Sequence, residues 1–153
     1  MSLKYDFFLN EKVTDLEPIE RLLKEKNIPY SKKVADRRIY FDAYEDLGFE
    51  ICIFRENTSY FEYQIHDTCH AYEWNDCTCV SFEVNKFFDN QKVKSNMLEM
   101  IIALFKSNAF DALLLFNGDV LILDRKNGKI NPNLESGFWK STDLLTRLEN
   151  QIH

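Results

Sequence analysis

Residues 111–124 read DALLLFNGDVLILD, and this stretch decides the fold. Two apolar runs, 112–116 and 120–123, lie on either side of the dipeptide Asn117-Gly118. Asn-Gly between two apolar runs is typical of a type I′ turn, in which both turn residues adopt positive φ. The stretch therefore predicts an antiparallel hairpin over residues 113–123, and apolar residues on both of its faces predict that it is buried.

Two amphipathic segments predict the main helices. Apolar residues recur at spacings of three and four between Asn90 and Asn108, and Asp89 or Asn90 can cap the start of this helix. The segment from Asp15 to Lys26 follows the same period, and Thr14 with Glu17 forms a capping box before it. We expect the helix that begins at Asn90 to be central and to lie across a sheet.

Short alternating segments predict the remaining strands, which are expected at 4–9, 37–43, 49–54, 60–65 and 78–84. Turns are expected at 45–48 and 56–59, residues 66–76 are expected to form a loop, and Asn127-Gly128 predicts one more turn before a short helix at 142–148. Short connections between consecutive strands favour antiparallel pairing. The order of elements predicts an α+β fold: a single, mostly antiparallel sheet with two main helices packed on one face.

Composition points to one domain over residues 1–153. Of the 153 residues, 45% are hydrophobic, 13 are Phe and only seven are Gly or Pro, a composition typical of a globular core. The sequence shows no apolar run near the roughly 20 residues that cross a bilayer, and no signal peptide. We therefore expect a cytoplasmic protein without a membrane partner.

Charge is distributed unevenly along the chain. The formal net charge is −6, and residues 42–83 hold ten acidic residues but a single basic one, Arg55. Nucleic-acid contacts need Lys and Arg, so an acidic middle segment argues against a nucleic-acid partner and favours a basic protein. The alternative interpretation is a solvated acidic face without a partner.

Aromatic and acidic residues alternate within this acidic segment, as they do in many protein interfaces. The candidate partner-binding residues are Tyr60, Glu62, Asp67, Tyr72, Glu73, Trp74 and Asp76. In a strand, Phe61 and Tyr63 would share one face and Tyr60 the other. We therefore expect Phe61 and Tyr63 in the core, and Tyr60, Tyr72 and Trp74 on the surface.

The same segment holds the chain's one group of metal-ligand residue types: His66, Cys69, Cys77 and Cys79. Zinc takes four such ligands, so a small zinc-binding domain is the alternative function. Buried cysteines also occur simply as small hydrophobic residues. The sequence contains no Gly-x-Ser-x-Gly and no glycine-rich phosphate loop, so we expect neither catalysis nor a cofactor.

Several motifs in the C-terminal half share their order and spacing with a known family. They are Val80 to Phe87, Asn96 to Leu98, Asp111 to Asp119, Leu123 to Arg125 and Gly137 to Trp139. Over about residues 80–139 the chain resembles the Sit-type immunity proteins of bacterial polymorphic toxin systems. The resemblance implies a small cytosolic protein that binds and neutralises a cognate toxin without catalysis, and it transfers no individual binding residue.

The acidic segment predicts that such a toxin is basic, because complementary charges favour binding. Three alternatives stay open at this point: a zinc-binding domain, an enzyme with an acid-lined pocket, and a homodimer that uses the same surface.

Overall fold

The computed structural model describes residues 3–12, 17–65, 67–140 and 143–151. Along the chain the elements are β1 (Leu3–Leu9), α1 (Glu17–Glu25), β2 (Ser31–Ala35), β3 (Arg38–Ala43), β4 (Phe49–Ile65), β5 (Thr68–Val84), α2 (Asn90–Ser107), β6 (Ala112–Phe116), β7 (Val120–Lys126), β8 (Lys129–Pro132), the 3-10 helix η1 (Gly137–Trp139) and α3 (Leu144–Gln151).

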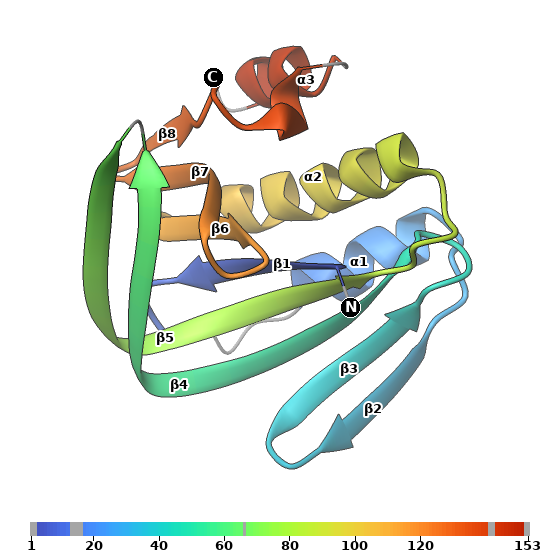
Figure 1. The fold of residues 1–153 in the computed structure, drawn as a ribbon. Helices are drawn as coiled ribbons and strands as arrows, with labels where there is room; N and C mark the ends of the chain where they lie inside the picture. The colour runs from blue at the N-terminus through green and yellow to red at the C-terminus, as the bar shows by residue number, and fades with distance from the viewer. Residues whose placement is uncertain (1–2, 13–16, 66, 141–142, 152–153) are drawn as a thin grey trace.

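The eight described strands form one sheet in the order β2-β3-β4-β5-β1-β6-β7-β8, and every neighbouring pair is antiparallel. The first strand, β1, lies between β5 and β6, so it joins the N-terminal strands to the C-terminal ones (Figure 1). The three described helices lie on one side of this sheet. The α+β fold with helices on one face is confirmed.

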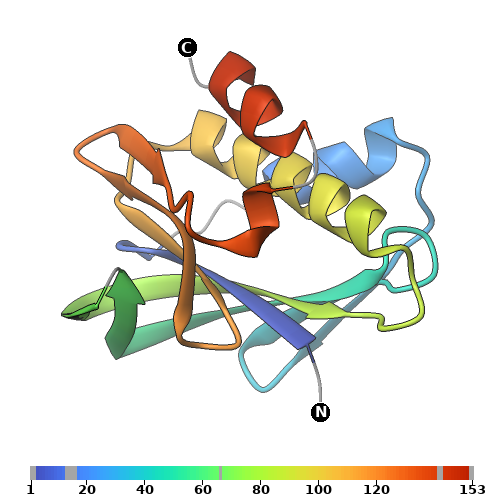
Figure 2. The same ribbon diagram turned by 45° about the horizontal axis from the view of Figure 1, so that its top comes forward.

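Helix α2 occupies the central position between α1 and α3, as Figure 2 shows. Asp89 caps its start, since the carboxylate accepts hydrogen bonds from the backbone N–H groups of Gln91 and Lys92. Both features agree with the prediction. The expected capping box of α1 rests on Thr14, which lies outside the described residues.

Both Asn-Gly turns form as expected. Asn117 and Gly118 have φ values of 49° and 85°, and Asn127 and Gly128 have φ values of 51° and 79°. Positive φ at both central residues is the type I′ geometry that matches the twist of a hairpin. The first turn joins β6 to β7, which confirms the hairpin, and the second joins β7 to β8.

The middle of the chain differs from the prediction. Strands β4 and β5 have 17 residues each and pair from Phe49 with Val84 to Ile65 with Thr68, with one break where Asn57 and Asp76 have no partner. The expected turn at 56–59 and most of the expected loop at 66–76 were wrong, because these residues belong to one long hairpin. The short strand β2 was not predicted, since four of its five residues are exposed and its sequence carries no alternating apolar pattern.

Two hydrophobic clusters hold the fold together. The larger one joins the helices to the sheet and includes Phe7, Phe82 and Met97. The smaller one includes Leu113 and Leu115, which alternate along β6 with residues of the larger cluster. The smaller cluster therefore lies on the sheet face opposite the helices. Within the described ranges, no helix combines the length and the apolar character that a bilayer crossing requires.

Candidate partner-binding surface

The β4–β5 hairpin has two halves with different surroundings. The proximal half, residues 49–56 and 77–84, lies within the sheet between β3 and β1. The distal half, residues 58–65 and 68–75, extends beyond these neighbours and curves toward β7 (Figure 1). Its inner face packs on the smaller cluster, where the Phe61 ring lies 4.4 Å from Phe8 and 5.1 Å from Trp74 between ring centroids.

Lys12 fixes the point where the two halves meet. Asp76 has a φ of 58°, a left-handed conformation that is uncommon for a residue with a side chain and interrupts the extended strand. The Lys12 ammonium lies 3.1 Å from the Asp76 carboxylate and donates to the Asn57 side-chain oxygen at 3.1 Å. One cation thereby joins both strands at the bend.

A second lysine contacts the middle of the distal half. The Lys126 ammonium of β7 donates a hydrogen bond to the Tyr72 hydroxyl and lies 4.5 Å from the centroid of that ring. This hydrogen bond is the main reason that the pKa of Tyr72 is lowered. The neighbouring Tyr63 ring stacks on Tyr72 with centroids 5.8 Å apart, and burial raises the pKa of Tyr63.

The outer face of the distal half is exposed and acidic. Tyr60 is 64% exposed and pairs directly with Glu73 on the adjacent strand. Its hydroxyl donates to the Glu62 carboxylate at 3.4 Å, and the negative charge of Glu62 is the largest cause of the raised pKa of Tyr60. The sequence holds no Lys or Arg from residue 56 to residue 76. Two carboxylates therefore flank an accessible tyrosine ring on a segment that contains no Lys or Arg of its own.

A hollow of about 310 Å³ lies beside this face, at the bend. Asp6 and Glu56 contribute carboxylates to its lining, Lys4 contributes an ammonium group, and Phe54 and Tyr60 contribute rings. The Asp6 carboxylate lies 3.7 Å from the ammonium of Lys4, whereas Glu56 accepts a hydrogen bond from Ser59 at 2.8 Å. Carboxylates next to aromatic rings suit a cationic side chain.

The structure separates the seven predicted partner-binding residues into groups. Tyr60, Glu62 and Glu73 share the outer face, and Asp67 is exposed near the hairpin turn. The expected exposure of Tyr72 and Trp74 was wrong: both are half-buried on the inner face, because they pair with Phe61 and Ser59. Asp76 is exposed and forms the ion pair with Lys12 described above. Phe61 and Tyr63 are buried, as expected.

The predicted zinc ligands are dispersed. Cys69 and Cys77 are eight residues apart on β5, roughly 26 Å of extended chain. Their thiols have separate partners: Cys69 donates to Glu62 at 3.3 Å, and Cys77 donates to Ser59 at 3.0 Å. Burial raises the pKa of Cys77 and of Cys79, which disfavours the thiolate that zinc binds.

His66 lies outside the described residues, and within the rest of the described chain no three His, Cys, Asp or Glu side chains come together as a metal site. The zinc alternative is therefore not favoured.

Two surface features could not be predicted from the sequence. Asp42, Glu50 and Glu83 lie side by side on β3, β4 and β5. The pKa of Glu50 is raised, mainly by burial and then by the negative charges of Asp42 and Glu83. Strand register creates this acidic row, and the sequence does not specify register. Phe87 is 97% exposed between β5 and α2, although its position before the helix gave no sign of a surface role.

These observations describe an α+β protein with helices on one face of its sheet and an acidic, tyrosine-bearing hairpin on the other side. A family model described as SitI3-like matches residues 3–143. The chain belongs to the SitI3-like family, and the family's name suggests a Sit immunity protein. Comparison with curated proteins gave no match, and neither did comparison with solved structures.

The family match supports the resemblance at the level of a Sit-type family and corrects its extent. Residues 80–139 were expected to carry it, whereas the match begins at residue 3 and so includes β1, α1 and both halves of the β4–β5 hairpin. The long hairpin is therefore part of the family domain.

Proposed function

We propose that this protein is an immunity protein that binds a cognate toxin and neutralises it stoichiometrically, without catalysis. The family match over residues 3–143 is the observation that carries this proposal. A protein that blocks a toxin by binding to it needs a stable fold and a complementary surface. It needs neither a cofactor nor a catalytic group.

The toxin docks on the outer face of the distal half and on the hollow beside it. Three observations support this surface: the exposed ring of Tyr60, the carboxylates of Glu62 and Glu73, and the absence of Lys and Arg from residue 56 to residue 76. Tyrosine is common among the residues that contribute most to binding energy, and surrounding charge increases the rate of encounter with a basic partner.

A lysine or arginine of the toxin enters the hollow at the bend. There its charge meets the carboxylate of Glu56, and its stem meets the ring of Tyr60. A toxin that acts on nucleic acid has such basic residues in its substrate cleft, since phosphate binding requires them. An acidic hairpin that covers the cleft would exclude the substrate.

Growth rescue tests the function. The C-terminal domain encoded by the gene next to that of this chain, as the candidate toxic domain, is expressed from an inducible promoter, with and without this protein. We expect the toxic domain to stop growth alone and growth to recover when both are present. Toxicity that this protein does not relieve, with both chains expressed in soluble form, would contradict the pairing.

Charge reversal tests the surface. The double variant Glu62→Lys/Glu73→Lys should lower the association rate with the toxin by about tenfold or more at low salt, and the dissociation rate should change less. Glu25→Lys/Glu149→Lys is the matched control, because it changes the net charge equally at exposed positions on α1 and α3. Equal effects of the two variants would place the interface elsewhere.

A further inference from the structure

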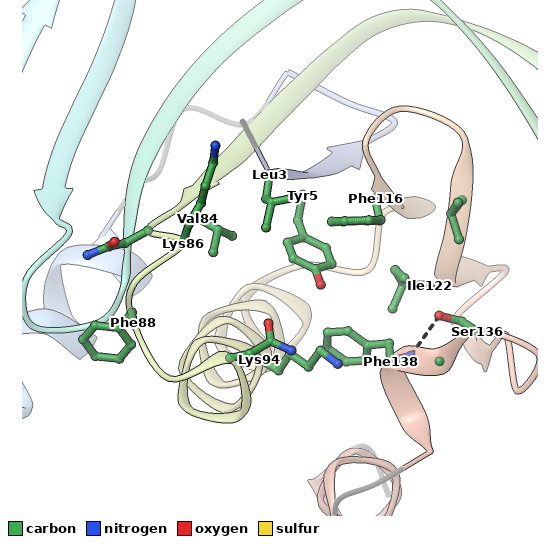
Figure 3. Close-up of a pocket in the computed structure, with 14 residues that line it drawn as sticks. Leu3, Tyr5, Val84, Lys86, Phe88, Lys94, Phe116, Ile122, Ser136 and Phe138 are labelled. Carbon is green, nitrogen blue, oxygen red and sulfur yellow. Dashed lines mark hydrogen bonds between the residues drawn. The ribbon is translucent and has the colours of Figure 1, made fainter. Parts of the chain in front are cut away.

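A second cavity lies on the helix side of the sheet, apart from the distal half. It has a volume of about 490 Å³, within the range of small-molecule pockets. Figure 3 shows it between the start of α2, strand β1, the β6–β7 hairpin and η1. Its walls are mainly apolar, with the rings of Phe88, Phe116 and Phe138 among them.

Two polar groups adjoin the same ring in this pocket. The Tyr5 ring centroid lies 5.9 Å from that of Phe138, and the Lys94 ammonium lies 5.4 Å from the Phe138 centroid. Tyr5 is only 7% exposed, yet its hydroxyl points into the pocket and makes no hydrogen bond with the described residues. Burial raises the pKa of Tyr5 to about 12, so this hydroxyl keeps its proton and remains a donor.

The surroundings of Lys94 lack negative charge. Neither Asp nor Glu is among the pocket's lining residues, and no described carboxylate forms an ion pair with Lys94. Partial burial lowers the pKa of Lys94. Lys86 and Asn90 also line the pocket. In a chain of net charge −6, this site is locally suited to an anion.

We propose that this pocket binds a small amphipathic carboxylate, such as a fatty acid. The apolar body packs against Phe116 and Phe138, and the carboxylate accepts hydrogen bonds from the Tyr5 hydroxyl and the Lys94 ammonium. An apolar wall with a few convergent polar donors is the usual design of a site for such a ligand. The inference is independent of the proposed toxin binding.

Calorimetric titration of the full chain at neutral pH, below the concentrations at which the probes form micelles, tests the ligand class. Three probes share one chain and differ in the head group: decanoate, decanol and decylamine. We expect saturable binding of one decanoate per chain, about tenfold weaker binding of decanol because the charge-assisted hydrogen bond is lost, and no binding of decylamine. Decylamine binding as tight as that of decanoate, or no decanoate binding, would overturn the proposal.

Two substitutions test the donors. Lys94→Met keeps most of the apolar stem and should weaken decanoate about tenfold while decanol stays within about twofold. Tyr5→Phe keeps the ring and should weaken decanoate about fivefold. Lys92→Met is the matched control, since Lys92 is exposed on the same helix and does not line the pocket. Equal affinities of Lys94→Met and Lys92→Met would overturn the assignment.

Backbone amide shifts give a readout of position that does not depend on the size of any heat signal. Decanoate should perturb residues 84–94, 116–122 and 136–138 and leave the distal half unchanged. Shifts confined to residues 58–75 would place the ligand at the other surface and overturn the site. Thermal unfolding establishes that each variant is folded before its affinity is compared.

Discussion

The two halves of the β4–β5 hairpin share one register but are stabilised in different ways. The proximal half has a hydrogen-bonded strand on each side and the helix layer on one face. None of the other described strands pairs with the distal half, which rests on the smaller cluster and on the contact between Tyr72 and Lys126. The fold therefore depends on the proximal half, whereas the distal half presents a surface that the rest of the protein only has to support.

The two halves therefore place different constraints on the amino-acid sequence. Inner positions of the proximal half must fill the space under three helices, so Phe49 and Phe82 are completely buried there. Outer positions of the distal half, such as Tyr60, Glu62 and Glu73, have few packing constraints, and their identity can follow a partner. A surface that can vary while the core stays intact would suit the immunity function proposed above.

Phe82→Ala should give the largest effect, because it removes a ring from the proximal core. Phe82 has no exposed surface, and its ring centroid lies 5.2 Å from that of Phe49 in an edge-to-face contact. We expect a loss of about 3–5 kcal/mol in the free energy of unfolding, measured by urea denaturation. A loss below about 1 kcal/mol would contradict the central role of the proximal half.

Phe61→Ala should act locally. It removes the ring between Phe8 and Trp74, so amide hydrogen exchange should accelerate in residues 58–75 while the proximal half keeps its protection. The global stability should fall less than in Phe82→Ala. Tyr60→Ala is the control, since Tyr60 is exposed on the same strand and should change stability by about 0.5 kcal/mol or less. Faster exchange throughout the sheet would show that the two halves unfold together.

The comparison also explains what could be predicted from the sequence. The hairpin at 113–123 and helix α2 carry local signals, an Asn-Gly turn and a helical period, and both were found. Asn57, Thr58 and Ser59 have the composition of a turn, but the pairing of Thr58 and Ser59 with β5 and the packing of Phe61 keep the strand extended. Tertiary contacts override local preference at this point.

The candidate site was partly predictable for a similar reason. Alternation along one strand placed Tyr60 and Glu62 on the outer face and Phe61 on the inner face. The faces of Tyr72 and Trp74 depend on which residues pair across the hairpin, and the expected loop concealed that pairing. The hollow at the bend requires β1 and both halves of the hairpin in three dimensions, which local patterns do not provide.

Lys126→Met tests whether the contact between Lys126 and Tyr72 stabilises the distal half. Loss of the hydrogen bond to the Tyr72 hydroxyl should return the pKa of Tyr72 upward toward its ordinary value, since this bond is the main cause of the lowered pKa. A tyrosine ¹³Cζ NMR titration measures this change. We expect the stability to fall by only about 0.5–1 kcal/mol, because the contact lies near the surface. Lys129→Met on β8 is the control. An unchanged pKa of Tyr72 would mean that Lys126 does not hold the hairpin in solution.

Thiol labelling gives the smallest effect, because it leaves the stability unchanged. It reports only on the accessibility of each cysteine and on the ionisation of its thiol. Cys69 is exposed on the distal half, whereas Cys77 and Cys79 are buried at the bend and in the proximal half. In the native protein, iodoacetamide should therefore modify Cys69 well before the other two, as mass spectrometry of peptides would show. The hydrogen bond to the Glu62 carboxylate is the main cause of the raised pKa of Cys69.

Glu62→Gln should lower that pKa and increase the labelling rate of Cys69 several-fold near neutral pH, because the thiolate is the reactive form. Glu73→Gln removes the same charge from the neighbouring strand and should have a smaller effect, since Glu73 makes no bond to the thiol among the described contacts. Equal rates at Cys69 and Cys79 would mean that the proximal half opens as readily as the distal half. The division of the hairpin into a structural part and a presented part would then fail.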